Sequence, residues 1–315
     1  MAAGGGGVRA IVAALLANAG IATAKFIGWG ITGSSSMLAE AVHSVADTSN
    51  QGLLLLGTRT SRRRPTQEHP FGYGRDRFFY SFVVALLLFS LGAVFASYEG
   101  IDKLRHPHEL TSPIVAVVIL VVAIALEAFS FRTAIQESNK VRGDATWWQF
   151  IRQAKTPELP VVLLEDAGAL LGLMLALIGV SLTAATGDPM WDAIGTLCIG
   201  ALLGVIAVIL IIETKSLLIG EGANPAMLRA IVAELEGGPV ERVIHIRTEY
   251  LGPEEMLVAA KIALSAGLTT MQVAQAIDDA ELKVRSRFPV ARLIYLEPDL
   301  DRSTVPGSDD VEVEA

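Results

Sequence analysis

Residues 34–53 read SSSMLAEAVHSVADTSNQGL, a mainly small and apolar run that contains four regularly spaced polar side chains. The four are Glu40, His43, Asp47 and Asn50, at intervals of three, four and three residues. Because an α-helix repeats about every 3.6 residues, this spacing places all four on one helical face. Ionisable groups at membrane depth are costly, and they usually face a bundle interior or an aqueous cavity. The stretch therefore predicts a membrane helix with a functional polar face.

The rest of the chain also has the composition of a membrane protein. Its 315 residues have a mean hydropathy of +0.49, with 52% hydrophobic and 18% charged residues, which is too apolar for a soluble protein of this length. About 20 helical residues span the hydrocarbon core of a bilayer. Six stretches reach that length, namely residues 8–31, 36–58, 78–101, 113–135, 159–183 and 191–212. An even number of crossings puts both ends of the chain on the same side.

The basic residues of the short loops predict the orientation. The loops after the second and fourth stretches are rich in lysine and arginine, whereas those after the first and fifth have none. Because cytoplasmic loops carry the excess of basic residues, we expect a multi-pass integral membrane protein with cytoplasmic N- and C-termini. We expect neither a cleavable signal peptide nor an organelle presequence, and the richness in alanine, glycine and valine favours a bacterial plasma membrane.

From Lys215 onward the composition becomes that of a soluble domain, with 10 basic and 17 acidic residues carrying most of the formal net charge of −8. The periodicity predicts helix, strand, strand, helix and strand at residues 225–235, 243–250, 256–264, 269–287 and 291–296. We therefore expect a membrane all-α six-span helical bundle in residues 1–213. A small cytoplasmic α+β domain of ferredoxin-like type, α-β-β-α-β, follows in 214–300, and an acidic, disordered tail in 301–315.

Several function classes are excluded by what the sequence lacks. No phosphate-binding loop, G-x-S-x-G nucleophile motif or H-E-x-x-H zinc motif is present, which argues against an ATP-driven pump and against an enzyme. The acidic balance argues against a nucleic-acid partner, which would require a basic face. Cys198 is the single cysteine, so a disulfide framework within the chain and cysteine-based metal sites are excluded.

The residues that point to chemistry lie on the second and fifth predicted spans. His43 and Asp47 stand one helical turn apart, and an imidazole with a carboxylate suits Zn²⁺ and neighbouring transition metals. The fifth span contains Glu165 and Asp166 in ELPVVLLEDAGALLG, residues 158–172. Adjacent helical residues point about 100° apart, so we expect only one of these two carboxylates to face the site. We favour Asp166, and Glu165 either completes the site after a helix rotation or pairs with a basic residue.

Four motifs together resemble those of the cation diffusion facilitators, a family of six-span zinc antiporters, and in particular the subgroup that contains human zinc transporter nine. The motifs are TGSSSMLAEAVHSVADTSNQ (32–51), HPFGYGRDRFF (69–79), VLLEDAGALLG (162–172) and YLEPD (295–299). The resemblance implies a homodimer in which each protomer holds a tetrahedral Zn²⁺ site between the second and fifth spans. Carried over by position, the metal ligands are His43, Asp47 and Asp166.

One departure from the family pattern concerns the fourth ligand. Most zinc-transporting members have histidine four residues before the fifth-span aspartate, where this chain has Val162. The alternatives for the fourth ligand are water, Glu165, Asn50, Asn18 or none. Fewer nitrogen ligands leave Mn²⁺, Fe²⁺ or Co²⁺ possible beside Zn²⁺. In the cytoplasmic parts only His69 matches the family's loop site, Tyr295 replaces a common histidine and His245 is isolated, so we expect no cytoplasmic metal cluster.

The sequence thus predicts a proton-coupled antiporter that exports Zn²⁺ or a related transition metal from the cytoplasm, with H⁺ as counter-ion. Its partners are the divalent metal ion, membrane lipid and a second copy of the chain. The alternative is a non-transporting membrane scaffold or regulator that has lost the fifth-span ligand at Val162. The remaining ionisable residues in or near the spans, among them Lys25, Glu127 and Asp192, are expected to pair with each other or to reach the membrane interface.

Overall fold

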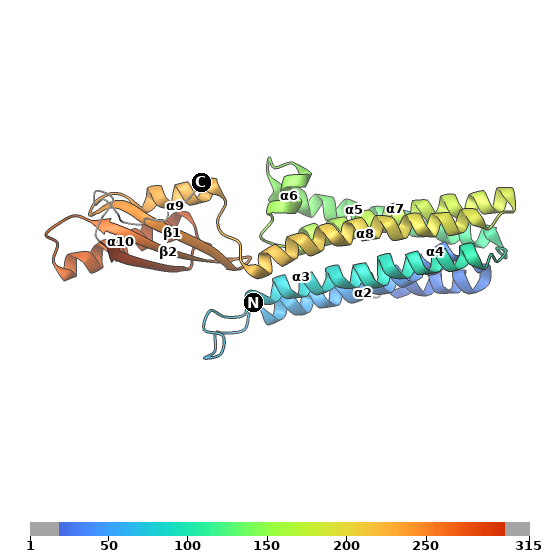
Figure 1. Cartoon of the computed structure of the whole chain (residues 1–315), viewed down its shortest axis with the longest axis horizontal. Coiled ribbons are helices and arrows are strands. Elements are labelled where there is room, and N and C mark those ends of the chain that lie inside the picture. The colour runs from blue at the N-terminus through green and yellow to red at the C-terminus, as the bar shows by residue number, and fades with distance from the viewer. Residues whose placement is uncertain (1–18, 300–315) are drawn as a thin grey trace, which may run out of the picture. The chain divides into compact units, whose positions relative to one another are not determined.

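A computed structural model of the chain describes residues 19–299, which form two compact units (Figure 1). The described part of the first unit is residues 19–60 with Arg77–Lys215, and that of the second is Ser61–Asp76 with residues 216–299. Asn18, the start of the first predicted span and the predicted acidic tail lie outside the described residues.

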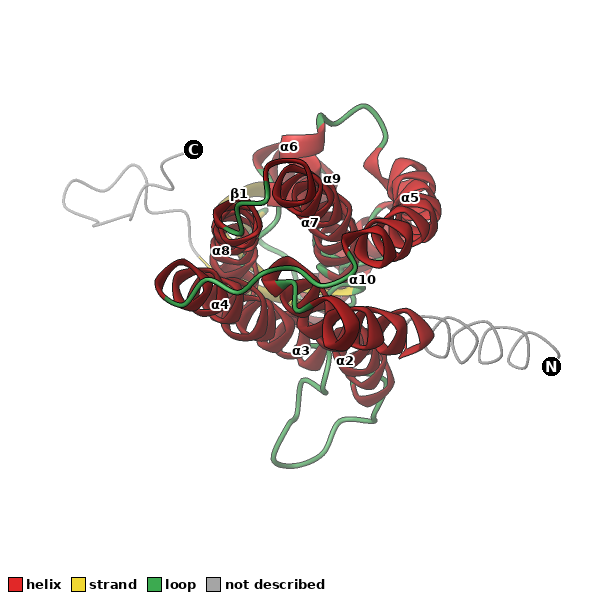
Figure 2. Ribbon diagram, turned by 90° about the vertical axis from the view of Figure 1, so that its right-hand side faces the viewer, coloured by secondary structure: helices red, strands yellow, loops and turns green. Residues whose placement is uncertain are grey.

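The first unit is a helical bundle that is seen end-on in Figure 2, where α7 lies between α5 and α8. Residues 19–32 are helical and are followed at once by α2. The third helix is continuous from Asp76 to Arg105 but contains a π-helical segment, η1, in its middle. The bounds are α2 Ser35–Thr60, α3 Asp76–Leu87, η1 Leu88–Val94, α4 Phe95–Arg105, α5 Pro113–Arg142, α6 Trp147–Gln153, α7 Glu158–Thr186 and α8 Met190–Ile219.

Four helices in the described residues are long and apolar enough to cross a membrane: Asp76–Arg105, Pro113–Arg142, Glu158–Thr186 and Met190–Ile219. These confirm four of the six predicted spans. The other two predicted spans are not confirmed. The first is described only from residue 19, and α2, which carries the polar face, is not among these four helices. A membrane bundle followed by a small domain with a three-stranded sheet is therefore established, whereas six spans remain a prediction.

The bundle core is built from the facing sides of α2, the continuous helix α3–η1–α4, α5, α7 and α8. Helix α7 packs against both α5 and α2, so that it connects the two sides of the bundle. Glycines permit close approach on α7, since a Cβ on Gly179 would lie 3.0 Å from the backbone oxygen of Trp191. The fully buried core side chains include Met37, Leu88, Leu120, Leu173, Ile199 and Leu203.

The start of α2 is held by a buried aspartate from α8. The carboxylate of Asp192 accepts hydrogen bonds from Ser34 Oγ at 2.8 Å, Ser35 N at 2.9 Å and Ser35 Oγ at 3.1 Å. The Ser35 amide belongs to the first turn of α2, whose donors have no partner within the helix. Asp192 thus caps α2 from another element and fixes the register of the helix that carries His43 and Asp47.

The second unit has the predicted order of elements, α-β-β-α-β. Strand β1 (Val240–Gly252) pairs antiparallel with β2 (Glu255–Leu264), which pairs parallel with β3 (Leu293–Asp299). Two helices complete the unit, α9 (Pro225–Leu235) and α10 (Thr270–Arg287). Asn224 caps α9 as predicted, and Thr269 forms a capping box with Gln272. Strand β1 extends beyond the predicted 243–250 because its ladder with β2 continues to both ends.

The loop 61–76 contains the HPFGYGRD motif and belongs to this second unit. Arg75 forms an ion pair with Glu249 of β1. Gly74 lies against the end of β1, where an added Cβ would stand 2.6 Å from the backbone oxygen of Leu251. A side chain does not fit at that position, which explains why the motif has glycine there.

Candidate metal centre

The polar face of α2 is buried in the bundle. Glu40, His43 and Asn50 have no exposed surface, and the side chain of Asp47 is 13% exposed. The His43 Nε2 atom lies 3.6 Å from Asp47 Oδ2, so the two groups separated by one turn are neighbours. The one-face arrangement of these four residues is therefore present in the structure.

Helix α7 brings its acidic pair to the same region. Asn50 Nδ2 donates a 2.7 Å hydrogen bond to Glu165 Oε1, which links α2 to α7 directly. Ser130 Oγ of α5 donates a 2.9 Å hydrogen bond to Asp166 Oδ2. Asn50 thus acts here as a partner of Glu165, and this contact orients the carboxylate toward α2.

A small cavity of about 20 Å³ lies among α2, α5, α7 and residue Ile21. That volume is enough for about one water-sized sphere. Both Glu165 and Asp166 line it together with Asp47, whereas the expectation that only one of them faces a site shared with His43 and Asp47 stays a prediction. Two adjacent side chains can border one cavity because it lies at the contact of three helices rather than on one side of α7. The lining residues are Ile21, Ser44, Asp47, Gln51, Glu127, Ser130, Val162, Glu165 and Asp166.

His43 is next to Asp47 but is not part of the lining of this cavity. Neither of its ring nitrogens has a hydrogen-bond partner in the described part of the chain. Within residues 19–299, no three His, Cys, Asp or Glu groups are close enough together to hold a metal ion. The conformation therefore gathers Asp47, Glu165 and Asp166 around one space without forming a closed ligand set.

A buried ion pair adjoins the site. Lys25 is fully buried, and its Nζ donates to Glu40 Oε2 at 3.2 Å and to Ser44 Oγ at 2.7 Å. The prediction that Lys25 pairs with another group is confirmed. Because Ser44 lines the cavity, this pair connects the helix of residues 19–32 to the wall of the site. The second oxygen of Glu40 faces α7, where a Cβ on Gly172 would come within 2.5 Å of it.

Four polar residues of the lining were not predicted from the sequence as part of the site. Ser44 and Gln51 are three residues before and four after Asp47, so helical spacing alone identifies them as members of the same face. Glu127 and Ser130 are polar residues of α5, one turn apart. Their spacing was a usable signal, but nothing in the sequence shows that α5 packs beside α7.

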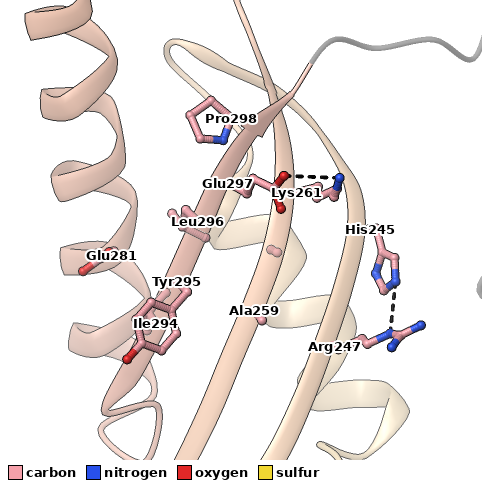
Figure 3. A pocket seen from close by; sticks show the side chains of 11 residues that line it. His245, Arg247, Ala259, Lys261, Glu281, Ile294, Tyr295, Leu296, Glu297 and Pro298 are labelled. Carbon is pink, nitrogen blue, oxygen red and sulfur yellow. Dashed lines mark hydrogen bonds and ion pairs between the residues drawn. The ribbon is translucent and has the colours of Figure 1, made fainter.

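The second unit has a larger cavity of about 630 Å³, over the sheet and its β3 edge (Figure 3). His245 Nε2 accepts a 3.2 Å hydrogen bond from Arg247 Nε, and Lys261 lies 3.3 Å from Glu297 and 3.2 Å from Asp299. Hydrogen bonds from Lys261 to Asp299 and Glu297 raise the pKa of the lysine above 10.5. Tyr295 lines this cavity and His69 packs against Tyr73 of the loop 61–76.

Comparison with known proteins agrees with these observations. The model of the cation efflux transmembrane domain matches residues 11–219. The mitochondrial proton-coupled zinc antiporter SLC30A9 of Xenopus laevis is 35% identical over 78% of this chain and 44% of its own length, and that of Homo sapiens is 32% identical over the same shares. Metal tolerance protein C4 of Arabidopsis thaliana is 28% identical over 98% of this chain and 73% of its own length. The chain thus spans less than half the length of the animal relatives.

Proposed function

The chain belongs to the cation efflux family, and from this premise we propose that it is a proton-coupled antiporter that exports Zn²⁺, or a related divalent transition metal, from the cytoplasm. The observation that carries the proposal is the convergence of carboxylates from α2 and α7 on one cavity inside an apolar bundle. The names of the animal relatives, which describe proton-coupled zinc antiporters, support the same cargo and counter-ion.

In this proposal Asp47 and Asp166 supply oxygen ligands and His43 supplies a nitrogen ligand after rotation of its ring toward the cavity. Glu165 already faces the cavity and is the nearest candidate for a further oxygen ligand. Asn50 positions Glu165 through the 2.7 Å hydrogen bond and is not itself required to bind the metal. A set rich in oxygen ligands also accepts Mn²⁺, Fe²⁺ or Co²⁺.

Exchange with protons follows from the chemistry of the same groups. Adjacent carboxylates in an apolar surrounding repel each other, and either a cation or bound protons must relieve that repulsion. Metal binding requires deprotonated ligands, so cargo and protons compete for one site. A bundle that exposes this site alternately to the two sides then couples a proton gradient to metal movement without ATP.

The arrangement in the membrane belongs to the proposal as well. We place the second unit and both termini in the cytoplasm, on the side that the basic loops indicate. The transporter acts as a homodimer, in which the second unit aids assembly. Composition favours a bacterial plasma membrane, whereas the animal relatives are named as mitochondrial, so the identity of the membrane stays a prediction.

One observation supports a second candidate. Val162 lines the cavity at the position where most zinc-transporting members have histidine, and it presents an apolar surface to the site. A scaffold or regulator that kept the fold and lost transport would lack a metal ligand in the way that this chain lacks the histidine at position 162. In that case metal binds weakly or not at all, and Val162→His restores binding.

The deciding experiment is metal flux into proteoliposomes with an imposed pH gradient, for Zn²⁺, Mn²⁺, Fe²⁺ and Co²⁺ separately. We expect gradient-driven flux in the wild type and its loss in Asp47→Ala and Asp166→Ala, with Lys140→Met as a surface control. Folding and dimerisation of each variant are checked by size-exclusion chromatography in detergent. Absence of flux for every metal in folded wild-type protein would refute transport and favour the scaffold.

A further inference from the structure

Glu127 of α5 is an acidic residue of the cavity for which the sequence predicts only a structural role. It borders the same space as Asp47, Glu165 and Asp166 and interacts electrostatically with all three. The side chain is half-buried, and its carboxylate has no hydrogen-bond or ion-pair partner among residues 19–299. Lys25, the cation near it, donates instead to Glu40 and Ser44.

The cavity also lacks one ligand of the usual family pattern, because valine stands at position 162 in place of histidine. Val162 lies one turn before Asp166 and lines the cavity beside it, so a histidine at this position would face the site. The valine leaves α7 with oxygen ligands only. Beside Glu165 of α7, a further donor can come from another helix that borders the cavity, and α5 is such a helix.

We propose that Glu127 is a metal ligand of the transport site and takes the place of the absent histidine at Val162. The site then draws donors from three helices, α2, α5 and α7, and its cargo is a divalent cation bound mainly by carboxylate oxygens. This inference rests on the proposed function, because it names a further residue of the same site.

A second observation concerns His43, which is not part of the lining but lies next to Asp47, with 3.6 Å between Nε2 and Oδ2. His43 is fully buried, and both of its ring nitrogens lack hydrogen-bond partners in the described residues. An unpartnered buried polar group is unfavourable, and a metal bound by Asp47 would engage one of the nitrogens after rotation of the ring toward the cavity. Glutamate has three rotatable side-chain bonds, so Glu127 can reach into the cavity without movement of α5.

Ligand type predicts the effect of Glu127 on selectivity. Carboxylates favour harder ions such as Mn²⁺, whereas imidazole favours Zn²⁺. Replacing Glu127 by glutamine should therefore weaken binding of Mn²⁺ more than that of Zn²⁺. A residue that only supports the helix packing would affect both metals alike.

The test measures metal binding by isothermal titration and flux in proteoliposomes, with Zn²⁺ and Mn²⁺ as probes. Glu127→Gln is compared with Glu137→Gln, a matched change on an exposed part of α5 where the carboxylate pairs with Lys140. We expect Glu127→Gln to raise the Kd for Mn²⁺ by at least about tenfold, as loss of metal-site groups generally does, and Glu137→Gln to leave it unchanged. The double variant Glu127→Gln/Val162→His should regain Zn²⁺ binding but not Mn²⁺ binding.

The outcomes separate the inference from the proposed function. Wild-type protein that binds metal but does not carry it refutes transport, while the binding comparison still tests Glu127. Unchanged Kd values and an unchanged Mn²⁺ to Zn²⁺ ratio in Glu127→Gln would overturn the inference even if flux is normal. Loss of both metals without rescue by Val162→His would assign Glu127 to packing, and no binding in the wild type would reject the site altogether.

Discussion

The buried pair of Lys25 and Glu40 permits a quantitative test of the structure. The side chains of Lys25 and Glu40 are 1% and 0% exposed, and the ammonium has two acceptors, Glu40 Oε2 and Ser44 Oγ. Lys25→Met keeps the length and apolar volume of the side chain but removes the charge. It leaves Glu40 without its cation in an apolar bundle, a change that destabilises buried pairs by about 3–5 kcal/mol.

The double variant Lys25→Met/Glu40→Met removes both charges together. Replacing a buried pair by apolar residues of similar volume is often neutral or stabilising by about 1–4 kcal/mol. We therefore expect the double variant to be more stable than Lys25→Met alone, which gives a strongly non-additive cycle. The control is Lys140→Met, which breaks an exposed pair with Glu137 and should change stability by less than about 1 kcal/mol.

The assay is reversible unfolding in mixed micelles, in which the fraction of denaturing detergent is raised stepwise. The free energy of unfolding is obtained from the unfolding curve of each variant. A Lys25→Met variant, or a matching Glu40→Met variant, near wild-type stability would show that Lys25 and Glu40 are solvated, contrary to the structure. A double variant as unstable as the sum of the single changes would show that the two charges do not interact.

Three further changes test other parts of the fold. Asp192→Ala removes the acceptor that caps α2 and should lower the free energy of unfolding by about 1–3 kcal/mol in the same micelle assay; an unchanged value would contradict the cap. Gly74→Ala places a methyl group against the backbone oxygen of Leu251, so limited proteolysis should cut the loop 61–76 faster than in the wild type. Asp299→Asn should lower the pKa of Lys261 toward 10.5 in an NMR titration. A lysine pKa that is raised by folding stabilises the folded state fully at pH values below the ordinary pKa of 10.5, and this stabilisation is lost only as the pH rises through the raised pKa. Stability near neutral pH should therefore not depend on this titration.

The sequence could predict what lies along one helix. The spacing of the polar residues of α2 predicts that they share one helical face. The same spacing of three or four residues predicts that Val162 lies on the side of α7 that carries Asp166. Alternation and capping signals gave the order of the second unit, since Asn224 and the strand periods act locally. These features depend on residues within about one helical turn or one strand of each other. Such residues are close together in the sequence, so their spacing can be read from it.

Contacts between helices could not be predicted in the same way. The pairing of Lys25 with Glu40 joins residues 15 positions apart, and that of Asn50 with Glu165 joins residues 115 apart. Helix α5 is the clearest case, because its apolar composition predicts a span but not which face meets α7. The sequence therefore predicts only that Glu127 pairs with another group or reaches the membrane interface, whereas packing places it at the cavity.

The charge balance of the cavity separates the two candidate functions on physical grounds. Asp47, Glu127, Glu165 and Asp166 surround a space of about 20 Å³, while the neighbouring Lys25 is engaged with Glu40. Charged groups inside a membrane are unfavourable unless they are paired, so this excess of carboxylates destabilises an empty bundle. A pure scaffold would be more stable with apolar residues at these positions. A transporter requires the excess, because repulsion among the carboxylates is relieved by a bound divalent cation in one state and by protons in the other.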